Sequence, residues 1–272
     1  MKTALVTGAS SGIGKSTAKR LLSDGLKVYV AARRMEKMQD LVELGAIAIQ
    51  FDITKQDEID ELWKEIETQD GGIDVLVNNA GYAIYGAVED TSIEDAKRQF
   101  EVNIFGLAYL TKKVIPQMRK KGAGKIINIS SAGGKLYTPL GAWYHATKHA
   151  LEGWSDCLRL ELKQFGIKVV IIEPGIIKTE FSDVLHNPFL KRSGSGYYKK
   201  MTEAMARLTA KQYDENGRGS SPDVIANVIS KAVRKKNPRT RYIKGSMGRL
   251  GIYSRRIIPD WLFDKILLSQ VK

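Results

Sequence analysis

The 272-residue chain is short of the residues that stabilise disulfide-bonded and metal-dependent proteins. It has one cysteine, Cys157, and three histidines, His145, His149 and His186. A single cysteine cannot form a disulfide within the chain, and no histidine is spaced with acids or cysteine as metal ligands are. We therefore expect a reducing compartment and a site without metal, with Cys157 in the core and the histidines in structural or surface positions.

Long hydrophobic runs are also absent. No apolar segment is long enough for a signal peptide or a membrane span, so we expect a cytoplasmic protein. No proline-rich, repetitive or linker-like tract divides the chain. These absences predict one catalytic domain over residues 1–245, followed by an extension over residues 246–272.

Acidic residues are scarce in the last part of the chain. Residues 231–272 hold twelve Lys and Arg against Asp260 and Asp264, which accounts for +10 of the net charge of +13. The apolar spacing after Pro259 predicts a short helix. We expect this helix to dock on its own or a partner subunit beside a solvated basic loop; peripheral contact with an anionic membrane surface, or a lid over a lipophilic substrate, is the alternative. No motif for specific nucleic-acid recognition accompanies the charge.

What the chain does contain is an alternation of short apolar runs and longer amphipathic segments. It predicts an α/β protein with a doubly wound Rossmann fold, in which a seven-stranded parallel sheet is flanked by helices on both faces. The pattern weakens over residues 175–221, which is typical of a substrate lid. Strands are predicted near residues 2–7, 27–32, 46–51, 74–78, 124–130, 168–173 and 240–244, and helices near residues 12–24, 35–44, 55–69, 94–120, 142–165 and 222–235.

The glycine-rich turn between the first strand and the first helix has two interpretations. Read from Thr7, it is a Thr-Gly-x-x-x-Gly-x-Gly turn, in which glycines let the backbone approach a dinucleotide pyrophosphate. Read from Ala9, it is a nucleotide-triphosphate P-loop that ends in Gly-Lys-Ser. A P-loop enzyme needs an acid at the end of a neighbouring strand to hold Mg²⁺. The strands near 74–78 and 124–130 lead into Asn-Asn and Ser-Ser instead, which favours the dinucleotide.

The end of the second strand predicts which dinucleotide binds. Where NAD-binding proteins carry an acid for the ribose hydroxyl, this chain has Arg33 and Arg34. Arg33 can present a bidentate guanidinium to a 2′-phosphate and stack on adenine, so we expect NADP(H). Arg34 either joins that phosphate site or begins a solvated helix.

Tyr144 and Lys148 are the candidates for catalysis. They lie four residues apart in a predicted helix, so both side chains project from one face. A phenol with a pKa near 10 needs a nearby cation to act as an acid-base catalyst at neutral pH, and Lys148 supplies one. Tyr-x-x-x-Lys alone is a weak signal, so the interpretation depends on the other motifs.

Together these motifs make the chain resemble the short-chain dehydrogenase/reductase family over about residues 1–235. The resemblance rests on Thr7 to Gly14, Asp52-Ile53, Asn78 to Gly81, Asn103, Ser130-Ser131, Tyr144 with Lys148, and Pro174-Gly175 with Thr179. It implies that Tyr144 is the general acid for carbonyl reduction and the base for alcohol oxidation. Lys148 would lower the tyrosine pKa and bond the nicotinamide ribose. Ser131 would bond the substrate oxygen, and Asn103 would hold a water that links Lys148 to solvent.

The resemblance also implies how the cofactor is bound. Asp52 would bond the adenine amino group with Ile53 beside it, and Ile177 and Thr179 would lie by the nicotinamide carboxamide. Members of the family commonly form homodimers or homotetramers, so an oligomer is implied. The predicted cofactor-binding set is Gly8, Ser10, Ser11, Gly12, Ile13, Gly14, Arg33, Arg34, Asp52, Ile53, Asn79, Ala80, Gly81, Tyr144, Lys148, Pro174, Gly175, Ile177 and Thr179.

Aromatic residues near the predicted site favour a bulky, apolar substrate, although about half of them are expected to be core packing. We predict an NADP(H)-dependent oxidoreductase that reduces a ketone or aldehyde to an alcohol, or catalyses the reverse. A 3-ketoacyl thioester on a carrier protein is the alternative substrate, and a non-catalytic NADP(H) sensor or scaffold is the alternative function. The candidate aromatics are Tyr82, Tyr85, Tyr137, Trp143, Phe181, Phe189, Tyr197 and Tyr198.

Overall fold

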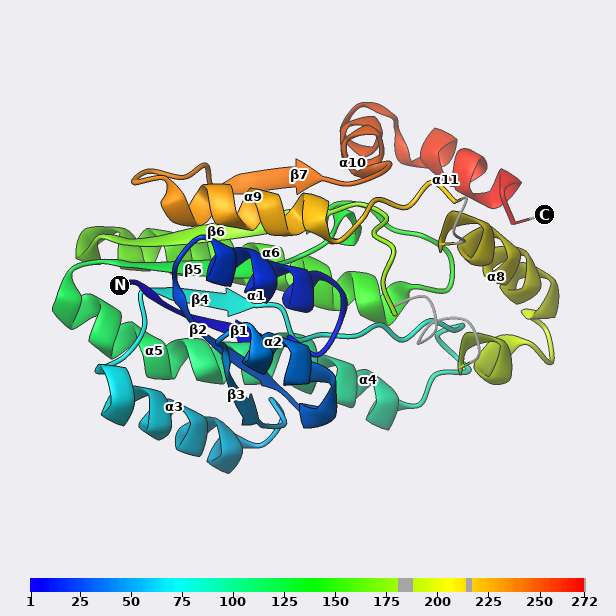
Figure 1. The fold of residues 1–272 in the computed structure, drawn as a ribbon. Helices are drawn as coiled ribbons and strands as arrows, with labels where there is room; N and C mark the ends of the chain where they lie inside the picture. Colours follow the sequence, from blue (N-terminus) through cyan, green and yellow to red (C-terminus); the bar gives the residue numbers. More distant parts are fainter. Residues whose placement is uncertain (181–187, 214–216, 272) are drawn as a thin grey trace.

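Seven parallel strands form a single sheet in the order β3-β2-β1-β4-β5-β6-β7 (Figure 1). The computed structural model describes residues 1–180, 188–213 and 217–271. The strands are β1 (Thr3–Thr7), β2 (Lys27–Ala32), β3 (Ile47–Gln50), β4 (Val75–Asn78), β5 (Gly124–Ile129), β6 (Ile167–Pro174) and β7 (Arg241–Lys244). The strand order reverses between β1 and β4, and α/β sheets bind ligands at the carboxyl ends of the strands beside such a switch. The predicted α/β class and seven-stranded parallel sheet are confirmed.

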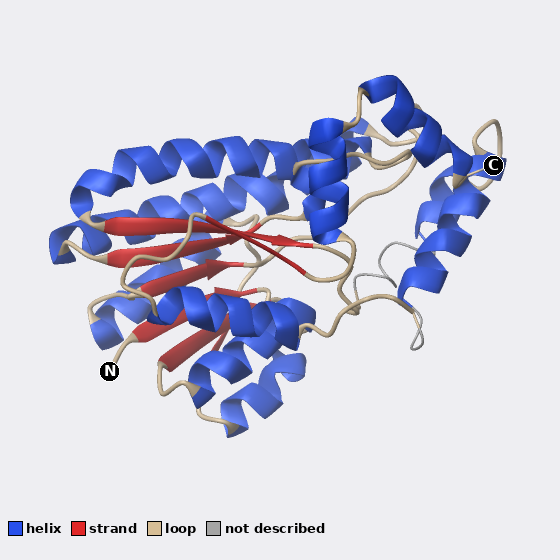
Figure 2. Cartoon of the chain, turned by 90° about the horizontal axis from the view of Figure 1, so that it is seen from above, coloured by secondary structure: helices blue, strands red, loops and turns tan. Residues whose placement is uncertain are grey.

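Helices cover both faces of the sheet, as Figure 2 shows. They are α1 (Gly12–Ser23), α2 (Gln39–Glu43), α3 (Gln56–Asp70), α4 (Ile93–Phe100), α5 (Leu107–Lys121), α6 (Ala142–Leu162), α8 (Lys199–Tyr213), α9 (Asp223–Arg234), α10 (Gly248–Ile257) and α11 (Asp260–Ser269). On one face, Ala4 and Val6 of β1 share a core with α1, α2 and α9. On the other face, Leu5 shares a core with α3, α5 and α6. Since successive strand residues point to opposite faces, both faces are buried and the predicted doubly wound arrangement is confirmed.

Three predicted helices differ in detail from the structure. The segment predicted near 35–44 begins as a 3₁₀ turn over Met35–Met38 before α2, and α6 ends in a 3₁₀ turn. The long helix near 94–120 is interrupted by a π-helical turn, Glu101–Gly106, between α4 and α5. A β-carbon on Gly106 would collide with the Ile53 carbonyl, so this turn brings the helix close to the segment after β3.

The expectation that Cys157 fills the core is wrong, because Cys157 is exposed on α6.

Beyond the carboxyl ends of the strands, α8, α10 and α11 gather at one end of the molecule (Figure 1). α8 lies within residues 175–221, where the sequence shows only a weak pattern. α11 confirms the short helix predicted after Pro259, whereas no helix was predicted for α10. Gly248 and Gly251 lower the helix propensity of α10, which explains the omission. Among the helices described, none combines the length and the apolar character that crossing a bilayer demands.

Candidate active site

A cavity of about 850 Å³ lies at the carboxyl ends of the strands. Segments that follow β1 to β6 line it on one side, and residues of α8, α10 and α11 line it on the other. Every predicted catalytic or cofactor-binding residue except Gly14 and Asn103 lines this cavity. The fold therefore brings together side chains and turns that are spread from Gly8 to Thr179 in the sequence.

The turn after β1 has the shape of a phosphate-binding cradle. Gly8 and Gly12 have φ angles of +65° and +53°, which residues with a β-carbon rarely adopt. A β-carbon on Gly14 would collide with the Asn79 side chain and the Gly8 carbonyl. Asn79 Nδ2 donates to two carbonyls of the turn at 3.0 and 3.2 Å and fixes it to the end of β4. The Ser11 side chain does not cap α1, and the first helical turn has no acid, so the helix N-terminus fits a pyrophosphate.

The lysine of the P-loop interpretation points away from the cavity. Lys15 Nζ pairs with Asp40 at 2.8 Å and donates to the Lys37 carbonyl at 2.9 Å. It does not line the cavity. A triphosphate site uses this lysine to bind the β- and γ-phosphates, so the geometry favours a dinucleotide at the turn.

Basic side chains gather where β2 ends. Arg33 is exposed and lines the cavity. Arg34 Nη2 donates to Ser10 Oγ at 3.2 Å and to Ser11 Oγ at 3.3 Å, and it pairs with Glu180 at 3.0 Å. Arg34 therefore belongs to the cavity wall and not to a solvated helix. No pattern in the sequence singled out Glu180, because its contact with Arg34 joins residues 146 positions apart.

Asp52 lies beside the same part of the cavity, two residues after the end of β3. Its Oδ1 accepts hydrogen bonds from the Thr54 amide at 3.0 Å and the Thr54 hydroxyl at 2.9 Å. Burial raises the pKa of Asp52, but these bonds and the nearby Arg33 outweigh burial and hold the pKa below its usual value. Asp52 is thus an ionised hydrogen-bond acceptor, which fits an exocyclic amino group of adenine.

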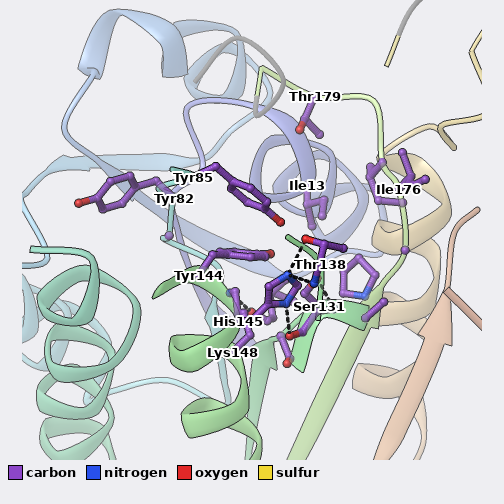
Figure 3. Close-up of a pocket in the computed structure, with 18 of the residues that line it drawn as sticks. Ile13, Tyr82, Tyr85, Ser131, Thr138, Tyr144, His145, Lys148, Ile176 and Thr179 are labelled. Carbon is purple, nitrogen blue, oxygen red and sulfur yellow. Dashed lines mark hydrogen bonds between the residues drawn. The ribbon is translucent and has the colours of Figure 1, made fainter. Parts of the chain in front are cut away.

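Tyr144 and Lys148 of α6 meet Ser131, which follows β5 (Figure 3). All three line the cavity, and Lys148 Nζ lies 5.9 Å from the centre of the Tyr144 ring. Lys148 Nζ donates to the Ile129 carbonyl at 2.9 Å, which anchors it to β5. Burial raises the pKa of Tyr144, while its hydrogen bond with Ser131 acts in the opposite direction. Burial also lowers the pKa of Lys148 to about 8, although the Glu152 carboxylate opposes this change.

His145 fixes the loop that carries Ser131, a role that no spacing in the sequence indicated. His145 Nδ1 lies 2.8 Å from the Gly133 carbonyl, and Nε2 lies 3.1 Å from the Thr138 amide nitrogen. A carbonyl can only accept and an amide can only donate, so Nδ1 carries the proton and Nε2 is the acceptor. Burial lowers the pKa of His145, which favours this neutral form. The structural role expected for His145 is consistent with these contacts.

Asn103 lies in the π-helical turn, behind the cavity wall. Its Nδ2 donates to the Tyr82 carbonyl and to Thr147 Oγ1, both at 3.0 Å, and its Oδ1 accepts from the Tyr82 amide at 3.1 Å. These bonds connect the segment after β4 to α6. The predicted role of Asn103 in holding a water is not tested by them and stays a prediction.

Three of the predicted substrate-facing aromatics, Tyr82, Tyr85 and Phe189, line the cavity. Tyr137, Trp143, Tyr197 and Tyr198 do not line it, and Phe181 and His186 lie outside the described residues. Most of the opposite wall is apolar and was not predicted from the sequence. It includes Met205, Ala206 and Leu208 of α8, Leu250 of α10, and Phe263, Ile266 and Leu267 of α11.

The sequence profile of the short chain dehydrogenase family matches residues 2–187, and the chain belongs to that family. It is an oxidoreductase that acts on a carbonyl or alcohol group with a nicotinamide dinucleotide. One similar protein is an NADPH-dependent 3-dehydrocapnine reductase of Ornithobacterium rhinotracheale, 36% identical over 287 residues that span 100% of this chain and 98% of the relative. Another is a 3-ketodihydrosphingosine reductase of Bacteroides thetaiotaomicron, 35% identical, with 94% of this chain and 93% of the relative covered.

Solved structures give the same family assignment. A short-chain dehydrogenase from Streptomyces avermitilis superposes with a TM-score of 0.81 at 34% identity and covers 97% of this chain and 95% of that one. The actinorhodin polyketide ketoreductase, solved with NADPH, superposes with a TM-score of 0.78 at 32% identity and covers 92% of this chain and 97% of that one.

Proposed function

We propose that the protein uses NADPH to reduce the ketone of a substrate with a long alkyl chain. The observation that carries this proposal is the apolar wall contributed by α8, α10 and α11, which lies in the same cavity as Tyr144. A chain of methylene groups gains about 0.8 kcal/mol for each group that such a wall removes from water. A small polar carbonyl compound would leave this wall without a partner.

The mechanism follows from the side chains at the end of β5 and on α6. The nicotinamide cofactor supplies a hydride to the carbonyl carbon when it is bound. Tyr144 donates its phenolic proton to the carbonyl oxygen, and the Ser131 hydroxyl donates a hydrogen bond to the same oxygen. The positive charge of the Lys148 ammonium group stabilises the negative charge left on the Tyr144 phenolate. Asn103 keeps the Tyr82 segment and α6 in register by bonding both.

The preference for NADPH over NADH rests on the charge at the end of β2. Arg33 and Arg34 both line the cavity, and Lys37 lies close enough to Arg34 to share Glu180 with it. A 2′-phosphate would find guanidinium groups where an NAD-specific site presents an acid. The relative from Ornithobacterium rhinotracheale is named as NADPH-dependent, which agrees with this proposal.

The names of two relatives support a lipid ketone as the substrate. One reduces 3-dehydrocapnine and the other 3-ketodihydrosphingosine, and both align over more than nine tenths of this chain. A 3-ketoacyl thioester on a carrier protein is a second candidate. It is favoured by the likeness to the actinorhodin ketoreductase and by the basic residues of the extension, which suit an acidic carrier.

The remaining predictions extend this proposal. We propose residues 1–245 as the catalytic domain and residues 175–221 as its lid, because Thr179, Glu180, Phe189 and α8 line the cavity. A homodimer or homotetramer remains a prediction from the family resemblance, and light scattering of the purified protein would test it.

A substrate panel tests the proposed function directly. The oxidation of NADPH and of NADH would be followed at the nicotinamide absorbance with long-chain 3-keto amines, 3-ketoacyl thioesters and short ketones. We expect the long-chain ketones to give the highest kcat/KM with NADPH, and the kcat of Tyr144→Phe to be lower by about 10² to 10⁴ in the matched assay. A preference for NADH would contradict the role of Arg33, and equal rates with short and long ketones would contradict the role of the apolar wall.

A further inference from the structure

Large apolar side chains are exposed along one face of α10 and at the start of α11. Leu250, Tyr253, Ile257 and Trp261 are 62%, 51%, 82% and 68% exposed. They are spaced three or four residues apart, so those on α10 share one face of the helix. The opposite face of α10 is docked, because Ile252 is buried. We call these four residues the apolar stripe.

Both helices are held firmly enough for the stripe to be a fixed surface. Phe263 of α11 is buried, and its ring packs edge-on against Tyr137 with centroids 5.3 Å apart. Arg255 lies 5.2 Å from the Tyr137 ring and pairs with Asp260 at 2.7 Å. The exposed apolar groups therefore stand on an ordered support, and they are not the frayed end of a helix.

Positive charge predominates in the segment that carries the apolar stripe. Residues 244–272 hold six Lys and Arg and two acids. Asp260 pairs with Arg255, and Asp264 accepts a hydrogen bond from Tyr137 at 2.8 Å. Arg249, Arg256 and Lys265 make no ion pair with any acid in the part of the chain that the structure describes.

The apolar stripe borders the substrate cavity. Leu250 belongs to the stripe and also lines the cavity. Met247 and Ile266 likewise line the cavity while they are 47% and 40% exposed. Residues that are exposed and line a cavity mark where it opens, so the cavity has one opening beside the stripe and another at the end that carries Arg33.

We propose that the apolar stripe, with Arg249, Arg256 and Lys265, binds the surface of a bilayer that contains anionic lipids. Trp261 and Tyr253 suit the boundary between headgroups and acyl chains, and the cations suit lipid phosphates. A second copy of this chain fits less well, because a two-fold contact through the stripe sets Arg249 and Arg256 against an equally basic surface. This proposal does not depend on which ketone is reduced. Binding through the stripe would place the nearby opening of the cavity against the lipid phase.

Vesicle flotation of the full chain tests the proposal without a substrate. We expect the protein to float with vesicles of phosphatidylcholine and phosphatidylglycerol and to bind vesicles of phosphatidylcholine alone at least about tenfold more weakly. Salt at about 1 M, where the Debye length is about 3 Å, should release most of the protein. Ile257→Ser with Trp261→Ser should lower the bound-to-free ratio at least about tenfold. Arg249→Gln with Arg256→Gln should lower it about fivefold for each charge removed.

Matched controls distinguish binding through this surface from nonspecific hydrophobic or electrostatic binding by the rest of the protein. Leu44→Ser removes an apolar side chain that is 56% exposed beyond α2, and Lys64→Gln with Lys120→Gln removes two exposed cations elsewhere. Both control proteins should float like the parent. No flotation of the parent, or equal loss in the control and stripe variants, would overturn the proposal.

Two further readouts cover the remaining outcomes. A fall in oligomeric mass for the stripe variants, without a change in flotation, would assign the surface to a second copy and overturn the proposal. If a stripe variant fails to fold, the parent protein still gives an answer. Its tryptophan emission should shift to the blue on anionic vesicles and lose that shift in Trp261→Phe, and an unchanged spectrum would contradict membrane contact.

Discussion

At the scale of single residues, burial shifts the pKa values of Tyr144 and Lys148 in opposite directions. It raises the pKa of Tyr144 and lowers the pKa of Lys148 to about 8, because a buried site disfavours both charged forms. A phenol with a raised pKa holds its proton at neutral pH, and the nearby Lys148 ammonium stabilises the phenolate that forms when this proton is donated. The Ser131 hydrogen bond then sets the direction of the phenol, so geometry and protonation state agree.

Replacement of Tyr144 by phenylalanine removes only the phenolic oxygen. We expect kcat for ketone reduction to fall by about 10² to 10⁴, the usual contribution of a general acid. The ring should keep its place, because its packing against Tyr85 and His145 is retained. NADPH binding, measured by fluorescence, should change little. Tyr109→Phe is the control, since its hydroxyl bonds Asp60 far from the cavity, and equal kcat in the two variants would contradict the mechanism.

Glu180 competes with a cofactor phosphate for the same cations. It pairs with Arg34 at 3.0 Å and with Lys37 at 2.7 Å, and these contacts hold its pKa below the usual value. We expect Glu180→Gln to lower the Kd for NADP⁺ about threefold to fivefold, the scale of an exposed ion pair, and to leave the Kd for NAD⁺ unchanged. Isothermal titration with both nucleotides checks this. Asp40→Asn frees two other lysines and is the control; an equal gain for NAD⁺ would refute the competition.

The residues that the sequence identified and those that it missed differ in one physical respect. Tyr144 and Lys148 are four positions apart, and Gly8 and Gly12 belong to one turn, so local geometry alone relates them. Glu180 follows β6 and contacts Arg34, which follows β2 and lies 146 positions earlier in the sequence, and no local pattern encodes such a contact. Cys157 was misplaced for a similar reason: which side of α6 is covered depends on packing between elements that are distant in sequence.

At the scale of elements, α6 places three functional groups one turn apart on a single face. Tyr144 and Lys148 reach the cavity, and Glu152 follows them into a buried cluster with Arg241 of β7 and Glu173 of β6. Burial raises the pKa of Glu173 to about 7, and the neighbouring Glu152 carboxylate adds to this. The Glu152 carboxylate also raises the pKa of Lys148, against the effect of burial. Glu152 is thus a positioning residue that acts through Lys148.

The pH profile of a Glu152→Gln variant tests this coupling. The positive charge of Lys148 stabilises the phenolate left by reduction, so kcat/KM should fall as pH rises through the Lys148 pKa of about 8. Glu152→Gln removes a carboxylate that raises this pKa, so the basic limb should move to lower pH. Glu161→Gln, on the last turn of α6, should leave the limb in place. A lower kcat with an unmoved basic limb would assign Glu152 a purely structural role.

Helices and strands were predictable from the sequence where apolar residues recur regularly along the whole element. β1 and α9 bury long apolar faces and were predicted within one or two residues. The π-helical turn that ends at Gly106 could not be foreseen, because it lies in close contact with Ile53, which is distant in sequence. α10 has a short buried face, centred on Ile252, and glycines that disfavour a helix, so its sequence reads as a loop.

At the scale of the whole molecule, the cavity has two sides that differ in how well the sequence predicts them. The carboxyl ends of β1 to β6 form the side of the cavity whose lining residues the motifs predicted almost completely. The opposite wall comes from α8, α10 and α11, whose positions depend on long-range packing such as the contact of Phe263 with Tyr137. In the proposed function, substrate choice therefore depends on the part of the chain that the sequence predicted least well.

A homologous series of ketones measures this wall directly. If the alkyl chain lies along α8 and α11, kcat/KM should rise about fourfold for each added methylene, as about 0.8 kcal/mol for each group implies, until the cavity is filled. Leu267 lines the cavity, so in Leu267→Trp the rise in kcat/KM should stop at a shorter alkyl chain. The kcat/KM of short ketones should not change. Leu268, its neighbour on α11, is 45% exposed and does not line the cavity, so Leu268→Trp should reproduce the parent series. If both tryptophan variants gave the parent series, the alkyl chain would have to lie elsewhere, and the apolar wall would not select the substrate.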